Sequence, residues 1–124
     1  MPWIVQTTHT TNYPNPISFT TGDQVETGIC DDEFPGWIRV KTRDGNQGWA
    51  PIQYLQIDEA GKTAIAKQDY SARELNTRVG EQLILQFEVN GWGWVENVHQ
   101  ETGWVPINTI KKMKISDQSI DSGL

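Results

Sequence analysis

A repeated five-residue pattern, Gly-Trp-x-Pro-Ile, is the part of this sequence with the clearest binding chemistry. It occurs as "GWAPI" at residues 48–52 and as "GWVPI" at residues 103–107. A polyproline II ligand has three residues per turn and rises about 3.1 Å per residue, so its prolines line one edge that parallel aromatic ridges can hold. The chemistry that such residues offer is apolar contact with an extended peptide.

Catalytic chemistry has weaker support. Cys30 with His9 or His99 could form a nucleophile and a base, but no motif places them together and a lone cysteine more often packs. Asp69 and Glu74 have no partner that would split their pKa values, as acid-base catalysis requires. The chain has neither a Cys-x-x-Cys pair nor a Cys/His cluster. We therefore predict a protein that is not an enzyme, with no metal and no cofactor.

The two patterns belong to a longer internal repeat. Residues 36–55, "GWIRVKTRDGNQGWAPIQYL", align without a gap with residues 91–110, "GWGWVENVHQETGWVPINTI". Upstream, "TGDQV" at residues 21–25 matches "VGEQL" at residues 79–83, with three extra residues in the first copy between the blocks. Two copies are too few for a solenoid, so the repeat indicates two tandem small domains.

The elements that position these residues are predicted to be short strands. In "EQLILQFEV" the apolar residues Leu83, Leu85, Phe87 and Val89 alternate with polar ones, which is typical of a half-buried strand. "WIRVKTR" alternates in the same way and is followed by "DGN", which can turn a hairpin. The sequence therefore predicts an all-β fold with domains at residues 1–58 and 63–114, joined by the polar segment "QIDEAGK", and a flexible tail at 115–124.

The order of these landmarks resembles the Src homology 3 (SH3) domain, and more particularly the tandem SH3-like proteins of bacteria. The second copy opens with "AIAKQDYSARELNTRVGEQL", which is similar to the family's Ala-Leu-Tyr-Asp-Tyr segment, its acidic RT loop and the turn that follows. Asp69 and Tyr70 match, whereas Lys67 and Gln68 depart from the pattern. The first copy keeps Ile-Ser-Phe and Gly-Asp, but "WIVQTTHTT" lacks the opening motif, and Tyr13 is the expected counterpart of Tyr70. The resemblance implies two small SH3-like barrels, each of about five antiparallel strands.

The resemblance also implies a peptide groove in each copy. The family's groove positions fall in the first copy on Tyr13, Trp37, Trp49, Pro51 and Tyr54, and in the second on Tyr70, Trp92, Trp104 and Pro106. Thr109 stands where the first copy has Tyr54, so we expect the first groove to bind proline better. Trp94 should share the outward face of Trp92. An exposed pair of tryptophans needs a partner.

Acidic residues are expected beside both grooves. Glu74 matches the family's acidic residue that pairs with a basic ligand side chain, and in the first copy Asp31, Asp32 and Glu33 lie just before Trp37. Structural alternatives stay open for all of these. The four groove tryptophans, Trp37, Trp92, Trp49 and Trp104, could be core residues, and the acidic run could be a solvated loop. The two prolines could be strand ends, while Trp94 could pack against the other repeat.

Charge and targeting signals narrow the classes of partner. Sixteen acidic against ten basic side chains give a net charge of −6, which argues against a nucleic-acid ligand. One cysteine fits a reducing cytosol, and the N-terminal residues show no export signal or membrane span. We expect a cytoplasmic protein without membrane contact, monomeric or weakly oligomeric, that binds a protein or peptide ligand.

Three functions remain in competition. The first is a non-catalytic module that binds extended Pro-rich or basic peptide segments through its aromatic grooves. The second is a structural or assembly protein whose two barrels pack together or oligomerise. The third, less favoured because no export signal is visible, is a cell-wall peptide binder of the bacterial SH3-like type.

Overall fold

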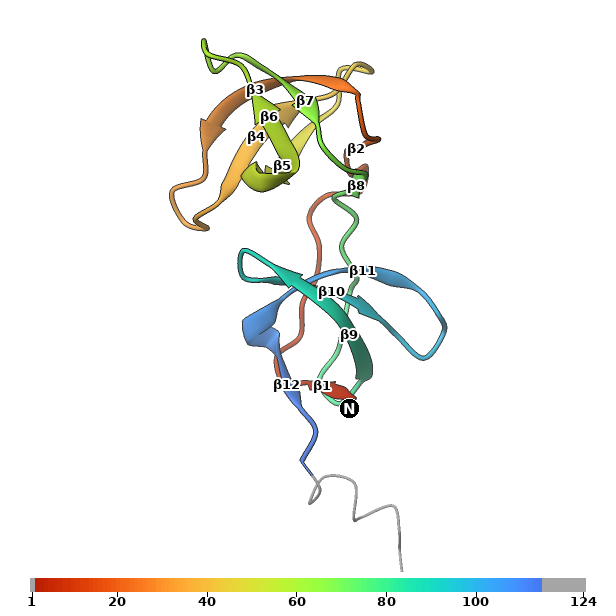
Figure 1. Ribbon diagram of the computed structural model, residues 1–124. Coiled ribbons are helices and arrows are strands. Elements are labelled where there is room, and N and C mark those ends of the chain that lie inside the picture. The colour runs from red at the N-terminus through yellow and green to blue at the C-terminus, as the bar shows by residue number, and fades with distance from the viewer. Residues whose placement is uncertain (1, 115–124) are drawn as a thin grey trace, which may run out of the picture. The chain divides into compact units, whose positions relative to one another are not determined.

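The protein is a chain of short β-strands with two 3₁₀ turns. The computed structural model describes residues 2–114, so the expected tail at 115–124 lies outside the described residues. Its elements in chain order (Figure 1) are β1 (Trp3–Val5), β2 (Ser18–Phe19), β3 (Gln24–Cys30), β4 (Trp37–Lys41), β5 (Gln47–Pro51), η1 (Ile52–Tyr54), β6 (Leu55–Ile57), β7 (Thr63–Ala66), β8 (Tyr70–Ser71), β9 (Gln82–Val89), β10 (Trp92–Glu96), β11 (Thr102–Pro106), η2 (Ile107–Thr109) and β12 (Ile110–Lys112).

The chain forms two compact units whose boundaries differ from the sequential ones expected from the repeat. Within the described residues, unit 1 consists of residues 2–11 and 75–114, and unit 2 of residues 12–74. The expected boundaries were 1–58 and 63–114. The difference arises because the first strand of each copy hydrogen-bonds within the sheet of the other copy.

Unit 1 contains a five-stranded antiparallel sheet in the order β11-β10-β9-β1-β12. β1 comes from the start of the chain and pairs with β9 on one side, where Trp3 lies opposite Leu83, and with β12 on the other, where Val5 lies opposite Ile110. The red β1 therefore lies beside the blue β12 in Figure 1. A strand that precedes all of unit 2 completes the sheet of unit 1.

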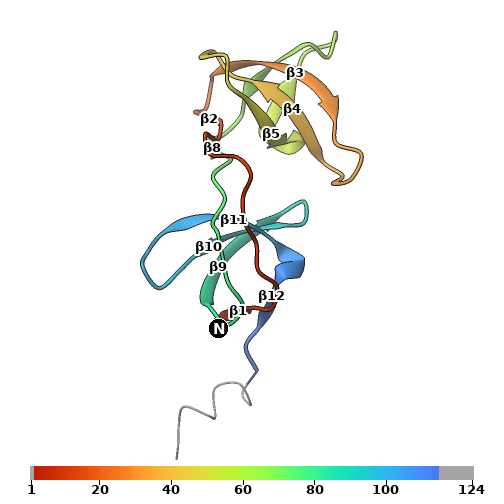
Figure 2. The same cartoon turned by 180° about the vertical axis from the view of Figure 1, so that it is seen from behind.

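Unit 2 has a matching sheet in the order β5-β4-β3-β7-β6. Here β7 lies between β3 and β6 and pairs with β3 through Ala64 and Val25 and with β6 through Ala66 and Leu55. A second, two-stranded sheet joins β2 to β8, with Phe19 opposite Tyr70 (Figure 2). The strand that opens the second copy of the repeat, β7, thus completes the sheet formed by the strands of the first copy.

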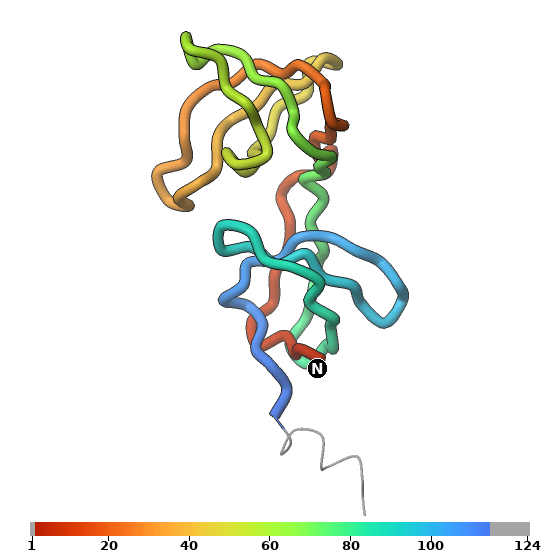
Figure 3. The backbone as a smooth tube through the Cα atoms, viewed as in Figure 1, coloured from red at the N-terminus to blue at the C-terminus, as the bar shows by residue number. Residues whose placement is uncertain are grey.

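The topology is that of one domain inserted into another. Unit 1 contains β1 and the strands from β9 to β12, and unit 2 is inserted in the chain between β1 and β9, so the backbone passes between the units twice (Figure 3). Unit 2 has the same sheet order, but its equivalent of β1 comes after β6 rather than first. The pairing of Ser18 with Ser71 brings the two ends of unit 2 together, which is the usual condition for an insertion that leaves its host intact.

Each unit has its own apolar core. In unit 1 the core comprises Val5, Leu75, Leu83, Val95, Val105 and Ile110, with Trp3, Leu85 and Ile107 packed against it. In unit 2 the buried apolar residues include Ile17, Phe19, Val25, Ile38, Val40, Ala50, Leu55, Ala64 and Ala66. Val5 and Ala64 show that the exchanged strands contribute to these cores as well as to the sheets.

This topology predicts which fragments of the chain fold. A fragment of residues 12–74 contains every strand of unit 2 and should unfold cooperatively on heating, as followed by circular dichroism. A fragment of residues 1–58 contains one complete copy of the repeat but lacks β7, so the edges of β3 and β6 stay unpaired and it should remain largely unfolded. Cooperative unfolding of the 1–58 fragment together with failure of the 12–74 fragment would contradict the exchange.

Candidate functional site: two aromatic surfaces

Unit 2 gathers aromatic residues from both copies of the repeat. The rings of Tyr54 and Tyr70 meet edge to face with centroids 5.7 Å apart, and Phe19 lies 5.2 Å from Tyr70 on the other side. The hydroxyl of Tyr70 donates a hydrogen bond to the carbonyl oxygen of Trp49 at 2.9 Å. Tyr70, expected in the second groove, therefore lies with the groove residues of the first copy because β7 and β8 belong to unit 2.

The remaining groove residues of unit 2 lie on the hairpin formed by β4 and β5. Trp37 pairs directly with Pro51 in the antiparallel register. The side chains are more enclosed than an open groove requires: Trp37, Tyr54 and Tyr70 are only 6%, 8% and 7% exposed, and Pro51 is fully buried. Trp37 is thus a buried residue, as the structural alternative for this position supposed.

Trp49 is half-buried and makes contact with a cation. It lies opposite Arg39 in the same hairpin, and the guanidinium carbon of Arg39 lies 5.4 Å from the centre of the Trp49 ring. This distance is within the range of a cation–π interaction. In unit 2 the outward face of this tryptophan is therefore already in contact with a basic side chain of the chain itself.

Burial changes the ionisation of both groove tyrosines. It raises the pKa of the Tyr70 phenol far above the ordinary value, and the negative charge of Glu74 raises it further. The pKa of Tyr54 is raised by burial as well, although a hydrogen bond with the Gln68 side chain partly opposes this. Glu74 belongs to unit 2 together with both tyrosines, and not to the unit of the second groove, where it was expected.

The acidic segment before Trp37 is an ordered turn. The carboxylate of Asp31 accepts hydrogen bonds from the backbone N–H groups of Glu33, at 2.7 Å, and Phe34, at 3.2 Å. Asp31 thus stabilises its own loop, as short acidic side chains do in turns. Asp32 and Glu33 are exposed, so they can contribute negative potential near the aromatic residues of unit 2.

In unit 1 the position of Tyr70 is taken by His9, which the sequence did not identify as a groove residue. Phe19 pairs with Tyr70 in unit 2, and Thr77, which matches Phe19 in the repeat, forms an isolated bridge with His9. The ring of His9 contacts that of Trp92 at 5.7 Å, edge to face. The expectation that Tyr13 is the counterpart of Tyr70 is therefore wrong. Tyr13 lies in unit 2 and is 48% exposed.

The signal that could have identified His9 is weak. Aligning "WIVQTTH" with "AIAKQDY" without a gap places Ile4 on Ile65 and His9 on Tyr70. The structure supports this alignment, since the β1 and β7 strands that begin the two segments make equivalent pairings in their sheets. The two segments otherwise share only that isoleucine, so the sequence alone gives little reason to prefer this alignment.

Unit 1 has its own aromatic cluster on the outward side of the sheet. Trp94 lies opposite both Trp104 and Phe87, and the ring centroids are 5.1 Å and 6.3 Å away respectively. Phe87 was expected on the buried face with Leu83 and Leu85, but it is 46% exposed. A β-bulge explains the difference. Val95 lies opposite Leu85 but Trp94 lies opposite Phe87, so β9 has one extra residue at this point and the alternation of its side chains is interrupted, which places Phe87 on the outer face with Trp94.

The remaining groove positions of unit 1 differ from those of unit 2 in burial and in residue type. Trp92 pairs with Pro106 as Trp37 does with Pro51, and both residues of this pair are half-buried. Thr109, in the place of Tyr54, is buried and its hydroxyl donates a hydrogen bond to the carbonyl oxygen of Pro106 at 2.6 Å. Unit 1 therefore has a histidine and a threonine where unit 2 has two tyrosines.

The candidates for catalysis belong to different units. Cys30 is exposed on β3 of unit 2, whereas His9 and His99 belong to unit 1. Within residues 2–114, no group of three or more His, Cys, Asp or Glu side chains could hold a metal ion. The same residues include no helix with the length and apolar character of a membrane span.

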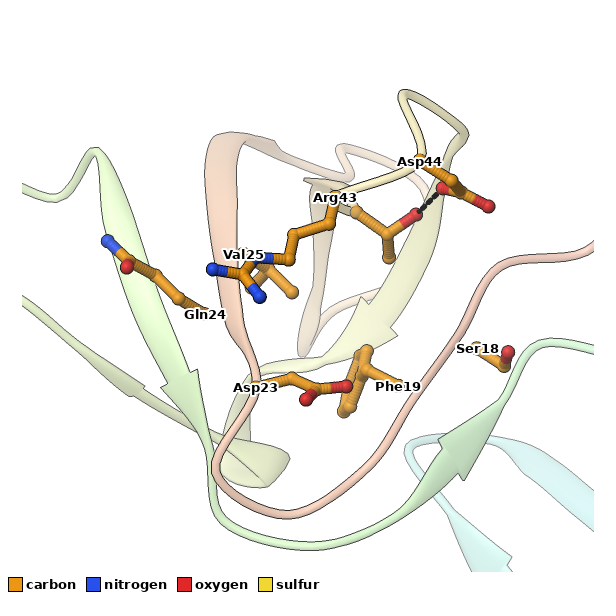
Figure 4. Close-up of a pocket in the computed structure, with 8 residues that line it drawn as sticks. Ser18, Phe19, Asp23, Gln24, Val25, Arg43 and Asp44 are labelled. Atoms are coloured by element: carbon orange, nitrogen blue, oxygen red, sulfur yellow. Dashed lines mark hydrogen bonds between the residues drawn. The ribbon is translucent and has the colours of Figure 1, made fainter.

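A shallow pocket of about 200 Å³ lies in unit 2 at the base of β3 (Figure 4). Its lining is mostly polar, with Arg43 and Asp44 from the β4–β5 turn and Asp23 from the start of β3. Asp44 accepts a hydrogen bond from the Thr42 hydroxyl, which lowers the pKa of that carboxyl group below its ordinary value. None of the residues expected to bind a peptide lines this pocket.

Comparison with known proteins supports the SH3-like character of the fold, and the matched segment follows the first copy of the repeat, so it includes β1 of unit 1 and not β7 of unit 2. A family model described as variant SH3 domain matches residues 4–58, the range from β1 to β6. The fold is all-β and built from SH3-like barrels. No solved structure matched the chain. SH3 domains are generally non-catalytic modules that bind peptides or other proteins, so the match supports an SH3-like interaction domain in this chain.

The raised pKa of Tyr70 predicts a pH dependence of stability. Because the folded state holds the phenol protonated above its ordinary pKa of about 10, its contribution to stability is complete below that pH and is lost as the pH rises further. Urea unfolding between pH 8 and 11 should show a steeper loss of unfolding free energy in the wild type than in Tyr70→Phe. Parallel curves for the two proteins would contradict the assignment.

Proposed function

We propose that the protein is a non-catalytic interaction module that binds extended peptide segments, Pro-rich or basic, and that unit 2 contains the better groove. The observation that supports this most is the meeting of Tyr70 with Tyr54, two residues from different copies of the repeat, at 5.7 Å in unit 2. The strand exchange moves the motif tyrosine from the second copy to the unit that has the other aromatic groove residues.

The distribution of charge supports the same unit. Glu74 belongs to the same unit as Tyr70 and Tyr54, and Asp32 and Glu33 are exposed on the loop before Trp37 of that unit. Carboxylates beside an aromatic groove favour a ligand that carries Arg or Lys next to its prolines. The protein's net charge of −6 adds a general attraction for basic segments.

The low exposure of the groove residues bears on affinity. Trp37, Tyr54 and Tyr70 present only a small part of their surfaces, and Trp49 is half-buried and already in contact with Arg39. A ligand that contacts so little apolar surface buries less than a standard interface, so we expect weak, rapidly reversible binding. Such affinities suit a module that is used together with other contacts.

Replacing Tyr54 by the residue of the other unit tests the groove. Tyr54→Thr removes one aromatic ring and should weaken a peptide with prolines three residues apart and one terminal arginine about fivefold or more, measured by NMR titration. Thr109→Val is the matched control in unit 1 and should leave the affinity unchanged. Absence of any shift at Tyr54, Tyr70 or Trp49 with proline-rich and basic peptides would contradict the proposed function.

The reverse substitutions predict a gain of binding. Changing His9→Tyr and Thr109→Tyr together gives unit 1 both tyrosines that unit 2 has, beside a Trp92–Pro106 pair that is more accessible than Trp37–Pro51. The double variant should bind the same peptide at a second site, seen as new shifts of the Trp92 indole signal. An unchanged stoichiometry in a folded double variant would show that the two tyrosines are not what distinguishes the grooves.

A further inference from the structure

The outward face of β9, β10 and β11 in unit 1 has the features of a second binding surface. Phe87, Trp94 and Trp104 form one row across the three strands, since Trp94 is the register partner of both other residues. Phe87 is 46% exposed and Trp94 is half-buried, whereas Trp104 is 3% exposed and forms the base of the row. We call this row, with Glu96, the unit 1 aromatic face.

The ring geometry indicates how a ligand could contact this face. Phe87 and Trp94 are nearly parallel, at 15°, and Trp104 is nearly perpendicular to both, at 86° and 71°. The 6.3 Å between the Phe87 and Trp94 centroids is less than two van der Waals contacts of about 3.5 Å each, so no group fits between the rings. A ligand must therefore lie over the exposed ring surfaces.

A carboxylate lies next to the rings. Glu96 follows Trp94 by two residues on β10, so both side chains project from the same face of the sheet. Its Oε1 atom accepts a hydrogen bond from the Gln86 side chain at 3.1 Å, which holds the carboxylate in position beside the row. Ile84, opposite Glu96 on β9, is 58% exposed and extends the apolar surface.

Unit 2 shows which ligand chemistry suits this position. Arg39 matches Trp94 in the repeat and Trp49 matches Trp104, and the guanidinium carbon of Arg39 lies 5.4 Å from the Trp49 ring centre. In unit 2 the chain thus places its own arginine over this tryptophan face. In unit 1 the corresponding residue is another aromatic ring, followed by an acid in place of Lys41.

We propose that the unit 1 aromatic face binds an arginine side chain of a partner protein, with the guanidinium over the Trp94 and Phe87 rings and paired with the Glu96 carboxylate. An aromatic surface attracts a cation through the ring quadrupole, and the planar guanidinium can stack on a ring and hydrogen-bond a carboxylate together. The site is separate from the unit 2 groove. This proposal rests on the proposed function, because both require the ligand to be a peptide segment of another protein.

The experiment uses the full chain and a peptide without proline, in which arginine alternates with glycine. NMR titration should show shifts of the Trp94 indole signal. The same peptide with citrulline, which keeps the shape of arginine without its charge, should bind at least about fivefold more weakly. Equal affinity for both peptides, or shifts confined to residues outside the unit 1 aromatic face, would overturn the proposal.

Trp94→Arg provides the sharpest variant, because it reproduces the Arg39–Trp49 pair of unit 2, where the fold accepts it. The chain's own cation should then occupy the face and reduce arginine-peptide binding about fivefold to thirtyfold. Val98→Arg adds the same charge at a residue that is 74% exposed and outside the face, and should change binding little. An equal effect of the two variants would overturn the proposal in favour of general electrostatic attraction.

Two further variants separate this site from the groove and from loss of folding. Glu96→Gln keeps the size of the side chain and should also weaken the arginine peptide, while leaving the proline-rich peptide unaffected. Tyr54→Thr should do the opposite. If the proline-rich peptide fails to bind but the arginine peptide still shifts Trp94, the proposed groove is wrong and this site stands. If Glu96→Gln is folded and binds the arginine peptide as the wild type does, this site is wrong.

Discussion

The pairing of β1 with both β9 and β12 is the interaction on which the architecture of this protein depends. β1 is only three residues long, yet it lies between two strands of unit 1 and inserts Val5 into the core at 1% exposure. Burying such a side chain stabilises a fold by about 1.5–3 kcal/mol, a large share of the stability of a small domain. Without β1, the edges of β9 and β12 that it covers would be unpaired. β7 has the same role in unit 2.

The exchange of these strands also determines the composition of the two aromatic surfaces. Because β7 and β8 enter unit 2, Tyr70 and Glu74 belong to the unit of Tyr54, where the rings of Tyr70 and Tyr54 are in contact, and not to the unit of Trp92. Unit 1 receives β1 and with it His9. Two copies of one repeat thus differ more as structural units than as sequence segments, since each unit combines a hairpin from one copy with an opening strand from the other.

The sequence was sufficient to predict the all-β fold and its SH3-like barrels, because the Gly-Trp-x-Pro blocks and the alternating segments are local signals. β4 and β5 formed where "WIRVKTR" and "GWAPI" indicated, and β10 and β11 where the second copy of the repeat did. Each of these strands pairs with a near neighbour in the chain, so local spacing determines the partner.

The exchange itself could not be predicted in this way. A short strand such as "WIV" or "TAIA" has the same pattern whichever sheet it joins, and the choice depends on contacts across the whole chain. Two details of the site could not be predicted from the sequence for similar reasons. The bulge that exposes Phe87 arises from the register between β9 and β10, and the burial of Trp37 results from tertiary packing, which local alternation does not report.

The position of β1 has a consequence for how the protein is made. During synthesis from the N-terminus, β1 emerges first, but its partner strands β9 and β12 lie beyond residue 81. Residues 12–74 include every strand of unit 2, so this unit can fold on the ribosome before β9 and β12, the partners of β1, have been synthesised. Unit 1 then forms last, through contacts as distant in the chain as Trp3 and Lys112, and such non-local contacts form slowly. We therefore expect the inserted unit to fold before the unit whose sequence it interrupts.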